Sequence, residues 1–231
     1  MTLAEKAYNA LRHDIIRGEF VQGGPLRLAD LAARYGMGFS PLREALNRLQ
    51  AERLVTAESL RGFRVASLSL DELHDSMSSR ILIEKTALRA AIRFGDDEWA
   101  AGIVSALYAL NIQAGRIGAD ADIWTLEARH YAFHRALLAA CRSPWMLEFF
   151  ERLYAATERY RIPVLLAASH PAGRDLQAEH GMLGQAVLDR DADKATALLE
   201  EHYRKTVNYL AQAMNTPDLA PNESLDADLC V

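Results

Sequence analysis

The first 68 residues carry apolar positions at spacings that predict three short helices and a hairpin. Apolar residues recur every three to four positions in three segments, 3–16, 28–35 and 40–53. Pro41 suits the first turn of the third segment, where a backbone N–H has no partner to lose. An Arg-Gly pair, Arg61-Gly62, then lies among alternating apolar residues, as in a hairpin turn. This order predicts a winged helix-turn-helix, whose third helix is slim enough to enter the major groove of DNA.

From residue 71 to residue 213 the apolar positions keep helical spacing, and no segment alternates as a strand does. Six helices are predicted, at 71–94, 96–116, 120–141, 144–167, 172–190 and 191–213. Short connections between long helices favour an antiparallel bundle. The fold class predicted is mainly α, with a winged helix-turn-helix at 1–68, an all-α antiparallel bundle at 69–214 and a flexible, polar tail at 215–231.

Charge is divided unevenly between these regions. The whole chain of 231 residues has a formal charge of −5, yet residues 1–68 hold ten Lys and Arg against seven Asp and Glu. Only this first region is therefore suited to face phosphate groups. No apolar run approaches the roughly 20 residues that cross a bilayer, and the first residues lack a secretory signal, so we expect a cytoplasmic protein without a membrane partner. With two cysteines in the chain, a metal would be held by nitrogen and oxygen.

Histidines distinguish the predicted bundle. His130 and His134 are four positions apart, about one helical turn, so both project from one face. His180 and His202 lie inside two later predicted helices. Four imidazoles that face one interior would suit Zn²⁺ or another late divalent ion. Taken singly, each is more often a hydrogen-bonded, half-buried histidine, so the residues alone leave both interpretations open.

The N-terminal segment resembles the DNA-binding domain of the GntR family of bacterial transcription regulators over residues 5–66. The resemblance rests on a glycine-proline loop, the run PLREAL and the Arg-Gly wing. The family usually has Ser-Arg-Thr before the proline, whereas this chain has Gly38, Phe39 and Ser40. Phe39 cannot bond guanine as the family arginine does but could touch a thymine methyl, so we expect a different operator. The residues predicted to contact DNA are Phe39, Ser40, Arg43, Asn47, Arg48, Arg61 and Gly62.

The bundle resembles the FCD ligand-binding domain through three motifs: DELHDSMSSRILIEKTALRAA, FHRALLAACRSPWMLEFFERL and AEHGMLGQAVLDRDADKATALLEEHY. In metal-containing relatives an Asp, a His one turn later and two further histidines bind the ion. The resemblance therefore implies a divalent metal, zinc above nickel, manganese or iron, on His134, His180 and His202. The Asp position falls on His130, which is the fourth predicted ligand. Its place could instead be taken by water or by Asp120, Asp122 or Glu127.

Arg80 matches a position that commonly faces the effector cavity in this family. A guanidinium opposite a metal would bind a carboxylate from both ends, and Arg159 and Arg161 are weaker candidates for the same role. The alternative for Arg80 is a surface ion pair with Glu84, worth at most ~0.5 kcal/mol.

The function predicted is a ligand-responsive transcription regulator, most commonly a repressor in this family and not an enzyme. A homodimer would bind a near-palindromic double-stranded DNA operator, and a small carboxylate effector would change the dimer geometry. The alternatives are a metal-dependent hydrolase that uses the histidines and a regulator whose metal is purely structural. The hydrolase alternative is weakened because the chain lacks an HExxH motif and because it gives the first 68 residues no role.

Overall fold

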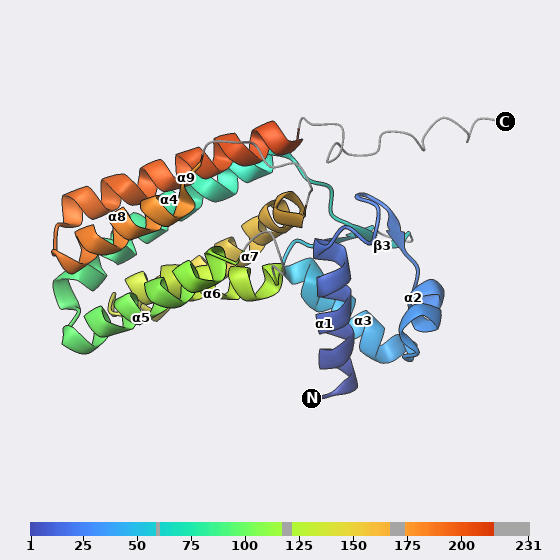
Figure 1. Cartoon of the computed structure of the whole chain (residues 1–231). Helices are drawn as coiled ribbons and strands as arrows, with labels where there is room; N and C mark the ends of the chain where they lie inside the picture. The colour runs from blue at the N-terminus through green and yellow to red at the C-terminus, as the bar shows by residue number, and fades with distance from the viewer. Residues whose placement is uncertain (59–60, 117–121, 167–173, 215–231) are drawn as a thin grey trace.

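The computed structural model describes residues 1–58, 61–116, 122–166 and 174–214. Its N-terminal part consists of α1 (Leu3–Ile16), β1 (Pro25–Leu26), α2 (Leu28–Tyr35), α3 (Phe39–Ala51), β2 (Val55–Glu58) and β3 (Gly62–Val65). Long helices then form a bundle, α4 (Leu70–Phe94), α5 (Asp97–Ala114), α6 (Ile123–Leu138), α7 (Pro144–Leu166), α8 (Leu176–Leu188) and α9 (Ala192–Met214). The predicted winged helix-turn-helix and helical bundle are confirmed (Figure 1).

The three N-terminal helices pack on a shared apolar core. Leu11 of α1 and Leu46 of α3 are both fully buried in it. Thr2 and Glu5 form a capping box at the start of α1, which satisfies two backbone N–H groups of its first turn. Gly36 ends α2 with a φ of +63°, a conformation that glycine adopts without strain. Gly36 thus allows the short turn that joins α2 to α3, as in a helix-turn-helix.

The wing contains one strand more than the sequence pattern predicts. Three antiparallel strands lie in the order β1-β3-β2. In β1, Pro25 pairs with Arg64 and Leu26 pairs with Phe63. A strand of two residues is too short to show alternation, and its partner lies far along the chain, so the sequence pattern predicts a loop there.

The six bundle helices run along a common long direction, with α4 packed on α7 and α9, and α5 packed on α6 and α8 (Figure 1). Phe133, Leu88 and Leu199 are at most 1% exposed in the core between them. A carboxylate or hydroxyl side chain caps the start of each of the six bundle helices by accepting a backbone N–H, namely Ser69, Asp96, Asp122, Ser143, Asp175 and Asp191. None of the described helices is long and apolar enough to cross a membrane.

The bundle contacts the winged helix through α7. Ile162 of α7 is fully buried in the apolar core of the N-terminal part. Arg12 of α1 forms a salt bridge with Glu158, and Arg159 Nη1 donates to the backbone oxygen of Arg53 over 2.9 Å. Thus α7 contacts the winged helix by apolar and ionic contacts together, and the first turn of α6 reaches the same apolar core.

Candidate metal centre and ligand cavity

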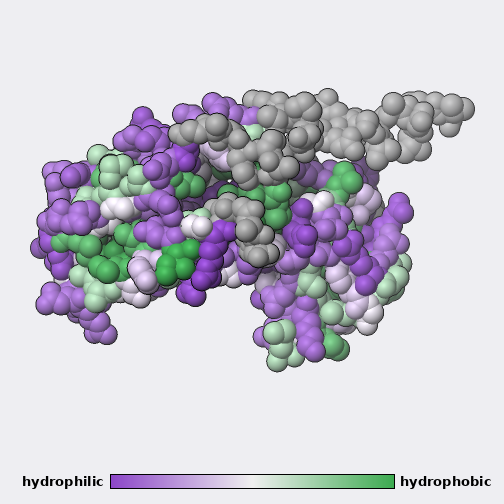
Figure 2. All heavy atoms as spheres, in the orientation of Figure 1, coloured by the Kyte–Doolittle hydropathy of each residue, from purple (hydrophilic) through white to green (hydrophobic). Residues whose placement is uncertain are grey.

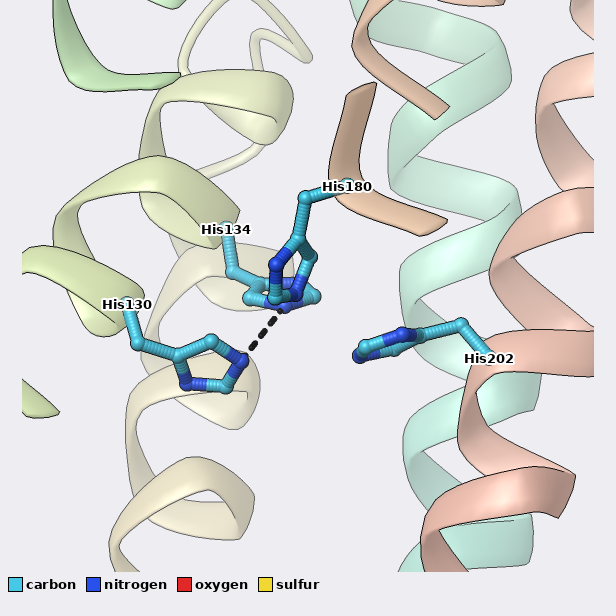
Figure 3. A group of neighbouring side chains, drawn as sticks. All are labelled: His130, His134, His180 and His202. Atoms are coloured by element: carbon cyan, nitrogen blue, oxygen red, sulfur yellow. Dashed lines mark hydrogen bonds between the residues drawn. The ribbon is translucent and has the colours of Figure 1, made fainter. Parts of the chain in front are cut away.

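Four histidines from three helices converge inside the bundle (Figure 3). His130 and His134 come from α6, His180 from α8 and His202 from α9. One ring nitrogen of each lies within 4.8 Å of the corresponding nitrogen of every other. The last three are buried and His130 is half-buried. The structure therefore brings together all four residues that the sequence singled out.

The outer ring nitrogens of two histidines bond to tyrosine hydroxyls. His130 Nδ1 lies 2.7 Å from the hydroxyl of Tyr154, and His134 Nδ1 lies 3.2 Å from the hydroxyl of Tyr203. The Nε2 atoms of these two imidazoles point toward each other and are 3.1 Å apart (Figure 3).

The other two histidines also contribute a ring nitrogen to the cluster. His202 Nδ1 is 2.9 Å from Oε2 of Glu179, so its Nε2 remains available to the cluster. His180 Nε2 is buried and has no hydrogen-bond partner among the described residues. A buried, unpartnered nitrogen is costly unless something binds it. This orphaned atom, inside a ring of imidazoles, fits a bound cation.

The electrostatics of the cluster favour neutral imidazoles. Burial is the largest effect, and it lowers the pKa of His130, His134, His180 and His202 below the ordinary value of 6.5. For Glu179, burial alone raises the pKa, but hydrogen bonds from His202 and Arg174 outweigh it and lower that pKa to about 2. Each neutral imidazole keeps one lone pair for a metal. Four nitrogen donors of this kind suit zinc and other late divalent ions.

The carboxylates considered as substitutes for His130 have other partners. Asp122 caps α6 by accepting from the backbone N–H of Trp124, and Glu127 forms a buried salt bridge with Arg161. Asp120 lies outside the described residues. Of the residues considered for the fourth position, the structure brings His130 into the cluster.

A cavity of about 430 Å³ adjoins the histidine cluster. His130, His180 and His202 line it, and its remaining wall is largely apolar, with Leu110 and Leu210 among its members. Three arginines also line this cavity, Arg80, Arg161 and Arg174. A pocket with a few convergent polar groups in an apolar wall is the usual form of a small-molecule site.

Arg80 lines this cavity and is 1% exposed. Its Nε donates to Glu84 over 2.7 Å, Nη1 to Thr157 over 3.0 Å and Nη2 to Tyr203 over 2.8 Å. The alternative of a surface Arg80–Glu84 pair is wrong, because the pair forms but both side chains are 1% exposed. Its neighbours lie on helices too distant in sequence for this burial to be predicted from i,i+4 spacing.

Arg161 and Arg174 are better placed to meet a ligand. Arg161 donates to Glu127 and to Thr157, but its Nε is buried without a hydrogen-bond partner in the described chain. Arg174 donates to Glu179 and to the backbone oxygen of His202. Sequence reasoning missed Arg174, because nothing in its local pattern separates it from a surface arginine.

Two family models match the chain. The model for "Bacterial regulatory proteins, gntR family" covers residues 3–65, and the FCD domain model covers residues 75–205. The chain belongs to the GntR family and carries an FCD domain. This is a family of transcription regulators and not of enzymes, which sets the hydrolase alternative aside.

Full-length relatives of this GntR regulator agree with the family match. It is 37% identical over 209 residues to the HTH-type transcriptional repressor GlaR of Escherichia coli K12, over 90% of this chain and 95% of that protein. It is 36% identical to the HTH-type transcriptional regulator BphR of Paraburkholderia xenovorans LB400, over 91% of this chain and 86% of that protein. The solved structure of E. coli McbR/YncC is 22% identical, covers 93% of this chain and all of its own, and has a TM-score of 0.74, which supports the fold.

The regulator presents most of its predicted DNA-binding side chains to solvent. Phe39 is 55% exposed in the first turn of α3. Ser40, Arg43 and Asn47 are also exposed, and Arg61 extends from the wing with 79% of its side chain accessible. Gly62 begins β3 with a φ of +83°, a turn conformation that glycine allows.

Two predicted site residues have partners that the sequence did not indicate. The guanidinium of Arg48 lies 4.0 Å from the ring centroid of Tyr8, so part of its surface is covered by α1. Arg159 does not line the cavity. It bonds to Arg53 and Glu72 at the contact between the regulator's two parts. The structure thus gives Arg159 an interdomain position, whereas Arg161 faces the cavity.

Proposed function

We propose that this regulator binds a near-palindromic operator as a homodimer, acts as a repressor, and is controlled by a divalent metal and a small carboxylate in its bundle. One observation carries this proposal: α7 contributes to the arginine-lined cavity beside the histidine cluster and also contacts the DNA-binding part. Zinc is the metal favoured by four imidazole donors, with nickel, manganese and iron as the metals to compare.

The charges at the site support a carboxylate effector. His130, His134, His180 and His202 would hold the metal and add no negative charge, so the ion would keep a charge of about +2. Arg161 has an Nε without a partner, and Arg174 lies at the same cavity. A carboxylate could therefore reach a metal from one side and a guanidinium from the other. The wall of leucine side chains would accommodate the carbon chain of a small organic acid.

The two faces of α7 support control of DNA binding by this site. Tyr154, Thr157 and Arg161 recur at helical spacing on the face that meets the histidines and the cavity. Glu158 and Ile162 lie on the face that contacts the winged helix. A displacement of α7 on ligand binding would therefore alter the position of both recognition helices in a dimer. For this to change operator occupancy, the ligand must favour one of the two arrangements.

An exposed apolar stripe on α5 supports the homodimer. No charged residue occurs from Trp99 to Gly115, and Figure 2 shows hydrophobic residues gathered over this region. Val104, Tyr108 and Ile112, spaced four apart on one face, are 52%, 68% and 42% exposed. Contiguous apolar surface of this kind is typical of protein contacts. Tyr108→Glu should convert the dimer to monomer in sedimentation velocity, whereas an unchanged sedimentation coefficient would exclude this face.

The function is tested by fluorescence anisotropy with DNA from upstream of the regulator's own gene. We expect tight binding that Arg43→Ala weakens, and a shift in affinity when zinc and members of a carboxylate panel are added. His134→Ala should keep DNA binding but lose that shift. If no DNA is bound, the regulatory function is refuted. If metal removal lowers thermal stability but leaves the carboxylate response intact, the metal is structural.

A further inference from the structure

Two matched hydrogen-bond chains lead outward from the histidine cluster. The first runs from His130 to Tyr154, Glu127 and Arg161, and the second from His134 to Tyr203, Glu84 and Arg80. Each has the order histidine, tyrosine, glutamate, arginine. Thr157 joins their ends, because its hydroxyl accepts from Nη1 of both arginines, over 3.0 Å and 2.8 Å.

The proton positions in each chain follow from the arginine end. A guanidinium only donates, so the glutamate beside it serves as an ionised acceptor. The tyrosine has a single O–H, and it donates that proton to the carboxylate, over 2.8 Å for Tyr154 and Glu127. The phenol oxygen can then only accept. The imidazole Nδ1 that contacts it must carry a hydrogen, and a neutral imidazole then has its lone pair on Nε2.

With hydrogen on both Nδ1 atoms, the close approach of the Nε2 atoms of His130 and His134 requires a cation. Nε2 of His130 and Nε2 of His134 are 3.1 Å apart, and both would present lone pairs. Two acceptors at that distance repel each other unless a positive ion lies between or beside them. The tyrosines thus orient this pair of imidazoles for metal binding before any metal arrives.

We propose that Tyr154 and Tyr203 are positioning residues that fix His130 and His134 as Nε2 metal ligands, so that His130 binds the ion itself. This inference rests on the proposed metal site. Groups that orient a ligating histidine typically contribute 10- to 100-fold to metal affinity. The aspartate that the family resemblance expects at position 130 would not need such a hydrogen-bond chain, because a carboxylate has no tautomer to fix.

The experiment measures zinc affinity of the full-length apoprotein by competition with a chromophoric chelator. Tyr154→Phe and Tyr203→Phe remove a single oxygen and should each weaken zinc binding about 10- to 100-fold. Tyr131→Phe is the matched control, since its ring packs on Tyr154 with centroids 5.1 Å apart but bonds to no histidine among the described contacts. It should stay within about twofold of the wild type. The proposal would be overturned if all three tyrosine variants bound zinc with the same affinity. It would also be overturned if His130→Ala bound zinc as tightly as the wild type.

A second measurement reads the tautomers directly and does not depend on the variants folding. Long-range ¹H–¹⁵N NMR on the wild-type apoprotein, labelled at histidine, should show His130 and His134 with hydrogen on Nδ1. Tyr154→Phe should change the signal of His130 alone. A hydrogen on Nε2 of His130 in the wild type would refute the proposed role of Tyr154. If the wild type binds no metal, the proposed metal site is refuted. The tautomers measured in the apoprotein would still show whether the two tyrosines fix His130 and His134.

Discussion

Replacing Arg80 by Met tests whether the Arg80–Glu84 ion pair beside the cavity is shielded from solvent. The change keeps most of the side-chain volume but leaves the Glu84 carboxylate 1% exposed, with the hydroxyl of Tyr203 as its remaining hydrogen-bond donor among the described contacts. Removing one partner of a buried ion pair typically costs about 3–5 kcal/mol, because the other charge stays desolvated. For a chain of this length that corresponds to a loss of roughly 6–20 °C in thermal midpoint.

The assay is urea unfolding of the apoprotein followed by circular dichroism, with the free energy of unfolding as the measured quantity. Arg80→Met combined with Glu84→Gln removes both charges and should recover more than half of the loss, since no buried charge is left alone. The exposed Arg152–Glu148 pair provides the control. It has the same four-residue separation and a distance of 2.6 Å, but its side chains are 72% and 47% exposed.

Arg152→Met should cost at most about 0.5 kcal/mol, because exposed helical pairs contribute no more than that. The reasoning is refuted if Arg80→Met costs no more than Arg152→Met, which would mean that Glu84 finds water. It is also refuted if the double variant is as unstable as the single one, because packing rather than charge would then explain the loss.

Three further predictions concern other parts of the molecule. Gly95→Ala should destabilise the fold by about 1–3 kcal/mol in thermal unfolding, since an added Cβ would lie 2.0 Å from the buried Trp99 ring. Gly102 has open space around it, so Gly102→Ala should instead stabilise the fold by up to about 1 kcal/mol. Phe39→Arg should move operator preference toward guanine by about 1–3 kcal/mol at one base, measured by anisotropy on operators varied at that base. As the pH is lowered below 6.5, the free energy of unfolding of the apoprotein should decrease by at most about 5 kcal/mol per pH unit, because the unfolded chain takes up protons that the folded chain does not take up at His130, His134, His180 and His202. A flat profile in pH-dependent urea unfolding would contradict this.

The helices were predictable because their periodicity is local. The predicted bounds of α1 and α2 coincide with those observed, and the end of α2 at Gly36 follows from a glycine-specific conformation. β1 was not predictable, since its two residues form a strand through pairing with Phe63 and Arg64. Periodicity records which face of an element is apolar, but it does not record which distant segment that face will meet.

Arg159 and Arg161 show where this limit affects the site. Both are buried, at 5% and 8% exposure, and both lie near the end of α7. Two residues on a helix correspond to about 200° of rotation, so these two side chains leave nearly opposite sides of α7. Because α7 has the cavity on one side and the DNA-binding part on the other, burial alone could not separate a ligand-facing arginine from an interdomain one. Tertiary contacts with Glu127 and Arg53 make that distinction.

His130 shows the same limit at the metal centre. Its spacing from His134 predicts a shared helical face, and the FCD resemblance expects an aspartate in its place. What distinguishes a ligand from a hydrogen-bonded core histidine is which ring nitrogen carries the proton, and that depends on Tyr154, 24 positions later, and on Glu127 behind it. A histidine in place of aspartate at this position needs a hydrogen-bond acceptor beside Nδ1, which fixes the tautomer and keeps the lone pair of Nε2 directed at the metal site. Position 154 therefore bears on whether position 130 can bind metal, and the two belong together when related sequences are examined for a four-histidine site.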